Sequence, residues 1–151
     1  MTVSVNRSIA APAERVYDLV TDLPRMGEWS PENTGGKWLD GATGPTVGAR
    51  FKGTNRKGAM RWSTTATVTD ATSPTSFAFD VSSGPLNVSR WSYTIAPTAT
   101  GCEVTETFTE RRPGLIAKIF DFGTRVSNRD DHNRRNIEVT LERLAAAAEA
   151  S

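Results

Sequence analysis

The feature that most restricts the fold of this 151-residue chain is a change of hydrophobic pattern at Pro113 and Gly114. Before it, from Gly35 to Arg112, short segments of alternating apolar and polar residues are separated by glycine and proline. After it, from Leu115 to Glu149, there is no proline, and apolar residues recur with a helical period. Short connections between alternating segments predict antiparallel hairpins rather than strands joined by helices. We therefore expect an antiparallel sheet followed by one long helix.

Two further elements precede this region. The opening TVSVNRSI places Val3 and Val5 on one face, as in a strand. APAERVYDLVTDL has helical spacing of its apolar residues, and we expect this helix to end at Pro24, with RMGEW adding at most one short turn. The predicted sheet then has about seven strands. The six later segments are GKWLD, GARFKGTNR, MRWSTTATVTD, TSFAFDVSS, VSRWSYTIA and CEVTETFTER.

Composition limits the classes of protein. The length suits one compact domain, residues 1–151. A net charge of +1, from 18 basic and 17 acidic residues, argues against nucleic-acid binding. No apolar run approaches the roughly 20 residues of a membrane helix. One cysteine, Cys102, and an N-terminus without a signal-peptide pattern favour a cytoplasmic location. No cluster of histidine and cysteine has metal-ligand spacing, so we expect neither metal nor cofactor.

This order of strand, helix pair, antiparallel meander and long terminal helix resembles the helix-grip fold of the START-like superfamily. The resemblance is closest to the polyketide cyclase/dehydrase and lipid-transport families, and it covers essentially the whole chain. The segments SIAAPAERVYDLVTDLPRMGEWSP and GARFKGTNR and the proline-headed terminal helix carry it. It implies an α+β, START/Bet v 1-like fold in which a curved sheet wraps around the C-terminal helix. It also implies an apolar cavity between the sheet and that helix.

Strand alternation assigns residues to the face that would line this cavity. The face is rich in aromatic residues, which are equally typical of an ordinary core. On the helix side, Phe120 is the aromatic candidate. The predicted ligand-binding residues of the sheet are Phe51, Asn55, Trp62, Thr64, Phe79, Trp91, Tyr93 and Phe108.

Glu106 is the most informative polar residue of the inward face, because it falls between Val104 and Phe108. A buried carboxylate needs a partner, a proton or water. Two interpretations remain open: a catalytic acid or base in the cavity, or a structural salt bridge to Arg134 or to a strand arginine.

The terminal helix has a polar interval on the face that contains Ile137. At 100° per residue, Asp130 and Asn133 lie within about 40° of Ile137, and Arg134 flanks them. We expect Asn133 and Arg134 to contact a ligand and Asp130 to be a second candidate acid or base. His132 points about 140° away from Ile137 on the same wheel, which predicts an exposed side chain and weakens any mechanism with histidine as the base.

Two tryptophans, Trp29 and Trp38, occur in a turn-rich segment. In the resembled fold this segment forms one rim of the cavity. The two side chains would either close over an apolar ligand or fix the helix pair to the sheet.

The predicted function is binding of a small hydrophobic molecule such as a polyketide, lipid or isoprenoid, by a monomer or homodimer. The alternative is a polyketide cyclase, aromatase or dehydratase. In that case Glu106 or Asp130 would act as the base, and Tyr93, Asn55 or Arg134 would polarise a carbonyl. A co-chaperone-like interaction module is a third, weaker hypothesis.

Overall fold

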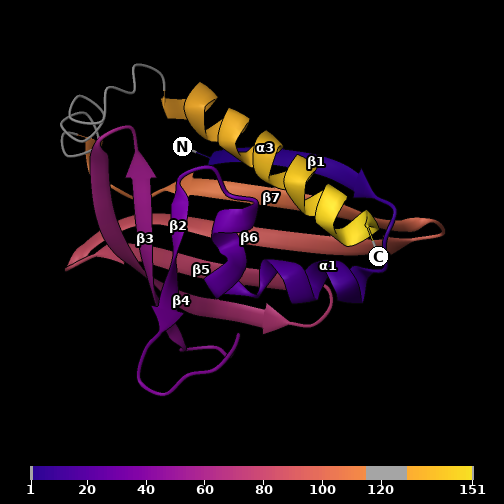
Figure 1. Cartoon of the computed structure of the whole chain (residues 1–151), viewed down its shortest axis with the longest axis horizontal. Coiled ribbons are helices and arrows are strands. Elements are labelled where there is room, and N and C mark those ends of the chain that lie inside the picture. Colours follow the sequence, from indigo (N-terminus) through magenta and orange to yellow (C-terminus); the bar gives the residue numbers. More distant parts are fainter. Residues whose placement is uncertain (1, 115–128, 151) are drawn as a thin grey trace.

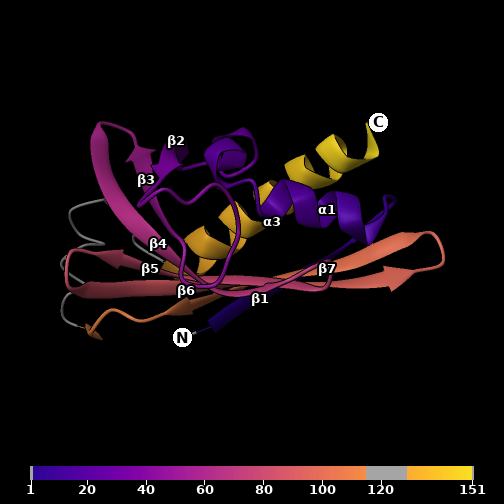
Figure 2. The same ribbon diagram turned by 90° about the horizontal axis from the view of Figure 1, so that it is seen from below.

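A computed structural model describes residues 2–114 and 129–150, with side chains of the terminal helix described from Asp131 onward. One curved sheet carries the helices on a single face (Figures 1 and 2). The elements are β1 (Thr2–Ile9), α1 (Ala13–Val20), the 3-10 helix η1 (Leu23–Glu28), β2 (Asn33–Trp38), β3 (Arg50–Lys57), β4 (Met60–Thr72), β5 (Ser76–Ser83), β6 (Leu86–Thr98), β7 (Gly101–Glu110) and α3 (Arg129–Glu149).

The sheet has seven strands in the order β1-β7-β6-β5-β4-β3-β2, and every neighbouring pair is antiparallel. Strands β2 to β7 form a meander of successive neighbours, as the short connections predict. β1 pairs with β7, so the first two strands of the chain lie at opposite edges of the sheet. The chain between them, α1 and η1, crosses the face of the sheet (Figure 1). The predicted α+β helix-grip fold is confirmed.

α3 lies across the same face as α1 and η1 (Figure 2). Its buried apolar side chains recur every three or four positions, which is the spacing of one helix face. The apolar residues of α3 that are buried are Ile137, Leu141, Leu144, Ala145 and Ala148. Arg15 of α1 donates to the backbone carbonyls of Ala147 and Ala148, which satisfies carbonyl groups at the C-terminal end of α3.

The inward phase of the strands is the predicted one. Buried residues occur at alternate positions, for example Cys102, Val104, Glu106 and Phe108 along β7. β4 departs from strict alternation where its register shifts between Val68 and Asp70. Such a bulge turns the following residues toward the other face of the sheet.

The first helix ends earlier than predicted. α1 stops at Val20, where Thr21 donates its hydroxyl to the carbonyl of Tyr17. Pro24, which we expected to end this helix, instead lies in the first turn of η1, a position where its missing N–H costs nothing. RMGEW therefore contributes to a separate 3-10 helix rather than to an extension of α1.

The terminal helix is long, and its described part has 21 residues. The predicted helical segment from Leu115 to residue 128, which includes Phe120, lies outside the described residues. Within the described ranges, no helix is long and apolar enough to cross a membrane.

Candidate functional site

A cavity of about 170 Å³ lies between the inner face of the sheet, η1 and α3. An engineered apolar cavity of roughly 150 Å³ accepts benzene, so this space can hold a small ring system. Most of the lining is apolar. The described residues around it are Leu23, Met26, Ser30, Glu32, Asn33, Phe51, Gly53, Asn55, Trp62, Thr64, Ala66, Phe79, Val81, Val88, Ser89, Trp91, Tyr93, Glu106, Phe108, Glu110, Arg112, Asn133, Asn136 and Thr140.

Aromatic side chains form one wall of the cavity. The rings of Trp91 on β6 and Phe108 on β7 pack with their centroids 4.8 Å apart, because these residues are direct cross-strand partners. Phe51 lines the wall from β3 and is backed by Trp38, whose ring packs edge-on at 5.4 Å. Such walls offer flat, apolar contact surface to a ring-containing molecule.

Glu106 is 2% exposed and lines the cavity from β7. The hydroxyl of Tyr93, its cross-strand partner on β6, donates to Glu106 Oε2 at 2.9 Å. The other carboxyl oxygen, Oε1, is buried and has no hydrogen-bond partner. The predicted salt bridge is therefore wrong for the described residues: the partner of Glu106 is a tyrosine, and Arg134 is exposed.

Burial raises the pKa of the Glu106 carboxyl to about 8, and the hydrogen bond from Tyr93 only partly offsets this effect. The same burial, with the adjacent carboxylate, raises the pKa of Tyr93 well above its ordinary value. At neutral pH the carboxyl thus holds a proton most of the time. A carboxyl group with a pKa near neutrality can donate a proton in its acid form and accept one in its carboxylate form.

α3 presents a polar strip to the cavity through Asn133, Asn136 and Thr140. Asn133 is 5% exposed, and its Nδ2 has no hydrogen-bond partner. Thr140 donates its hydroxyl to the backbone carbonyl of Asn136, so that hydroxyl already has an acceptor. Nδ2 of Asn133 is therefore a donor that remains available to a bound molecule.

The rim of the cavity joins the turn after η1 to α3. Nε2 of His132 lies 2.8 Å from Oε2 of Glu32, and Nδ2 of Asn136 lies 3.2 Å from the same ring nitrogen. The prediction of an exposed His132 is wrong, since only 15% of its side chain is accessible. His132 does point away from the face of Ile137, as the helical wheel predicted. The turn between η1 and β2, which contains Glu32, covers His132 on that side of the helix.

A second charged pair lies at the far end of β7. Arg112 contacts both carboxylate oxygens of Glu110, at 2.6 and 3.0 Å, and both side chains are largely buried. A bidentate pair of this kind satisfies the guanidinium and carboxylate against each other. It lines the cavity without adding net charge to it.

Most of the predicted site residues meet at this cavity. Asp130 is the second described residue of α3, but its side chain, like residue Phe120, lies outside the described part. Arg134 is exposed and does not line the cavity, which corrects its predicted position. The predicted residues that do line it are Phe51, Asn55, Trp62, Thr64, Phe79, Trp91, Tyr93, Phe108, Asn133 and Glu106.

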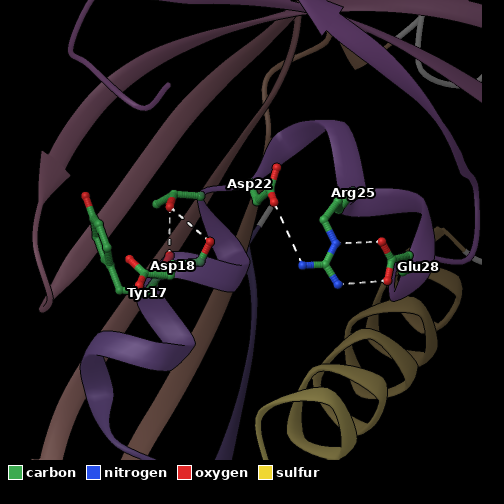
Figure 3. Close-up of polar contacts among 6 residues, drawn as sticks. Tyr17, Asp18, Asp22, Arg25 and Glu28 are labelled. Carbon is green, nitrogen blue, oxygen red and sulfur yellow. Dashed lines mark hydrogen bonds and ion pairs between the residues drawn. The ribbon is translucent and has the colours of Figure 1, made fainter. Parts of the chain in front are cut away.

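Neither Trp29 nor Trp38 is among the residues that line the cavity. Trp29 is 2% exposed and belongs to the core, while its neighbours Met26 and Ser30 line the cavity. Arg25 holds this segment in shape: it contacts Asp22 and Glu28 (Figure 3), and its guanidinium lies over the Trp29 ring at 5.5 Å. For Trp29, the structure agrees with the second alternative, in which it fixes η1 to the sheet.

Several lining residues were missed by the sequence analysis. On the helical wheel, Thr140 and Asn136 lie about 60° and 100° from Ile137, on the same side as Asn133, so the wheel could have indicated them. Glu110 shares the alternation of Glu106 along β7. Glu32 had no such signal, because it lies in an irregular turn whose position depends on the packing of η1.

Nothing in the described ranges suggests a metal centre, since no group of three potential metal-ligating side chains occurs there. Cys102 is buried and unpaired, and burial raises the pKa of its thiol. This environment makes it an unreactive packing residue.

Comparisons with solved structures agree with this architecture. A protein from Chromobacterium violaceum matches with a TM-score of 0.74 at 17% identity, over 98% of this chain and 97% of that one. The di-domain ARO/CYC of the steffimycin biosynthetic pathway matches with a TM-score of 0.76 at 14% identity, over 99% of this chain and half of that protein. At these identities the similarity shows the fold alone.

A nearer relative is the Polyketide_cyc-like protein of Corynebacterium glutamicum, with 31% identity, a TM-score of 0.63, and coverage of 99% of this chain and 90% of that one. A search of curated proteins found no match. The family model described as polyketide cyclase/dehydrase and lipid transport matches residues 1–149. The chain therefore belongs to the polyketide cyclase/dehydrase and lipid transport family.

Proposed function

We propose that the protein binds a small hydrophobic molecule in the cavity between the sheet and α3. The observation that carries this proposal is the cavity itself: an aromatic, largely apolar space with a few inward polar groups. This combination is typical of sites for small organic ligands, in which apolar walls give affinity and single polar groups give orientation. Polyketides, lipids and isoprenoids all have this character. A cytoplasmic location stays a prediction from composition.

The experiment is native mass spectrometry of the protein purified without denaturation, compared with the same sample after denaturation. We expect a discrete additional mass that is lost when the protein unfolds. Ala66→Phe should abolish this adduct, because Ala66 lines the cavity and a phenyl ring would fill it. Thr65→Phe is the matched control, since the neighbouring residue on β4 points to the opposite face of the sheet.

An adduct that survives Ala66→Phe would contradict the proposal, because the molecule would then be bound elsewhere. The melting temperatures of both variants should be measured alongside. They show whether loss of the adduct reflects a filled cavity or an unfolded protein.

A second candidate function is a cyclase or dehydratase reaction, and Glu106 favours it. A carboxyl with a pKa of about 8, hydrogen-bonded to Tyr93 and facing the cavity, has the properties of a general acid or base. The related di-domain ARO/CYC belongs to a biosynthetic pathway, which is compatible with such chemistry here. In this hypothesis Glu106 would move a proton to or from a bound carbonyl compound.

Glu106→Gln separates the two functions. If the protein is an enzyme, this variant should lose turnover of a polyketone substrate while it retains substrate affinity, because glutamine keeps the shape but cannot transfer the proton. If the protein only binds, wild type and variant should both return the polyketone unchanged. Glu103→Gln is the control, since Glu103 lies on the same strand and accepts a hydrogen bond from Ser8 on the opposite face.

A further inference from the structure

Two buried polar atoms in the cavity lack a hydrogen-bond partner. They are Oε1 of Glu106 on β7 and Nδ2 of Asn133 on α3. Across the described residues only one other buried side-chain atom is in this state, Oδ1 of Asp80, and it has Arg90 nearby at 3.5 Å. An unsatisfied buried polar group costs about 1–3 kcal/mol, so two in one cavity call for a common explanation.

Both atoms can donate a hydrogen bond at neutral pH when Oε1 carries the carboxyl proton. Oε2 of Glu106 accepts the hydroxyl of Tyr93, and a carboxyl proton carried by Oε1 preserves this hydrogen bond. Burial raises the pKa of this carboxyl to about 8, which keeps the proton in place at neutral pH. Nδ2 of Asn133 is an amide nitrogen and can only donate. A hydrogen-bond acceptor is consequently the kind of group that would satisfy both atoms.

The cavity also lacks an available countercharge in its described lining. Its charged or titratable side chains, besides Glu106, are Glu32, Glu110, Arg112 and Tyr93. Arg112 contacts both oxygens of Glu110, and Glu32 lies against His132. Among the described lining residues, the site thus has donors to offer, but no available cation that would compensate a buried anion.

We propose that Glu106 and Asn133 form a donor pair that selects uncharged ligands with a carbonyl-type oxygen, such as a ketone or a quinone. This inference rests on the proposed function of the cavity as an apolar binding site, and it specifies which ligands enter. A ligand oxygen would satisfy the two donors, while the aromatic wall contacts the rest of the molecule.

Charged analogues are disfavoured for different reasons. A carboxylate would lose its hydration without meeting an unpaired cation. An ammonium group could attract the proton-free form of Glu106, but it would leave Nδ2 of Asn133 without an acceptor. A hydrocarbon of the same shape would leave both donors unsatisfied. The carbonyl compound alone matches the whole arrangement.

The test uses four probes of the same size: acetophenone, cumene, benzoate and α-methylbenzylammonium. Their binding to the folded protein is measured at neutral pH by calorimetry or by NMR titration. We expect acetophenone to bind about tenfold or more tightly than cumene, since each buried unpaired donor carries a penalty of that order. Benzoate and the ammonium probe should bind at least tenfold more weakly than acetophenone.

Three variants identify the donors. Asn133→Leu should weaken acetophenone about tenfold and leave cumene unchanged or improved, because only the ketone uses the amide. Glu106→Leu should do the same. Glu106→Gln should retain the preference for acetophenone, since its amide can accept from Tyr93 and donate to the ligand. Asn87→Leu, at an exposed position on β6, is the control and should change neither affinity.

The outcomes separate this inference from the proposed function. Equal affinity for acetophenone and cumene, or tightest binding of the ammonium or carboxylate probe, would overturn the donor pair while leaving an apolar binding site. Equal weakening of both neutral probes by Asn133→Leu would also overturn it, since a merely structural asparagine would act that way. Failure of all four probes to bind would contradict both proposals.

Discussion

The two halves of the interface between α3 and the sheet differ although the same helix and the same sheet form both. In the closed half, Leu141 and Leu144 of α3 belong to the buried apolar core together with residues of α1 and Phe77 of β5. In the cavity half, α3 presents Asn133 to the wall that contains Glu106, and space remains between helix and sheet. The closed half stabilises the fold, and the cavity half is available for binding.

The closed half and the cavity half are separated by only two positions along β7 and by one turn along α3. Along β7, Val104 is fully buried apolar core, and Glu106, two positions further, lines the cavity. Along α3, Ile137 is fully buried, and Asn133, one turn earlier, lines the cavity. A molecule bound in the cavity would supply the hydrogen-bond partner that Glu106 and Asn133 lack. Along β7, the alternation of buried residues continues from one half to the other.

The largest expected effect is in the closed half. Phe77 is fully buried and packs against the rings of Tyr17 and Phe79. Phe77→Ala should lower the free energy of unfolding by about 3–5 kcal/mol, as for other fully buried aromatic residues. Chemical denaturation of wild type and Phe77→Ala measures this difference in the free energy of unfolding. A loss below about 1 kcal/mol would mean that this half is not close-packed and that the comparison is mistaken.

The next effect concerns the carboxyl in the cavity half. Folding raises the pKa of Glu106 from 4.5 to about 8, so the folded state binds a proton that the unfolded state has released between these values. The stability from this group is complete below about pH 4.5 and is lost as the pH rises toward 8. From about pH 5 to about pH 7 the loss should be about 2–3 kcal/mol, at about 1.4 kcal/mol per pKa unit.

Glu106→Gln has no proton to lose and isolates this contribution. The difference in unfolding free energy between wild type and Glu106→Gln should change with pH over this window. A pH-independent difference for Glu106→Gln would show that the carboxyl titrates normally and is hydrated in the folded protein.

A smaller loss of stability is expected for an aromatic residue of the cavity half. Trp91 is half-buried, and part of its ring faces the cavity. Trp91→Ala should cost about 1–2 kcal/mol, less than a truncated core tryptophan, because the cavity already deprives the ring of some contacts. Affinity for cumene should nevertheless fall about tenfold. If the stability loss reached that of Phe77→Ala, the wall would be ordinary core.

The smallest expected effect is at the rim. Glu32→Gln weakens the contact with His132 that joins the η1–β2 turn to α3. The loss of stability should be under about 1 kcal/mol, because both side chains are partly exposed to water. Dissociation of a bound probe should become a few-fold faster, measured by NMR line-shape analysis. Glu138→Gln, an exposed position on α3, should leave the rate unchanged. An unchanged rate in Glu32→Gln would show that ligands exchange elsewhere.

The sequence predicted the closed half and the strand side of the cavity half well, because both depend on the regular spacing of inward-facing residues along strands and helices. Alternation placed Glu106 and the aromatic wall inward, and helical spacing placed Ile137 and Asn133 on the buried face. The spacing of residues in the sequence did not predict the contacts between different helices and strands. His132 was predicted to be exposed, since the turn that holds Glu32 has no period from which its position could follow. The hydrogen bond between Tyr93 and Glu106 depends on the register of β6 against β7. Alternation shows which face a residue is on, but it does not show which residue lies opposite on the next strand.

The measurement that tests the comparison most directly is an NMR titration of the protein with acetophenone, following backbone and side-chain amides throughout the chain. We predict saturable shifts in the cavity half, at Nδ2 of Asn133 and Nε1 of Trp91, and little change around Leu141, Leu144 and Phe77. Shifts centred on the closed half, or non-saturable shifts spread over the surface, would contradict the account.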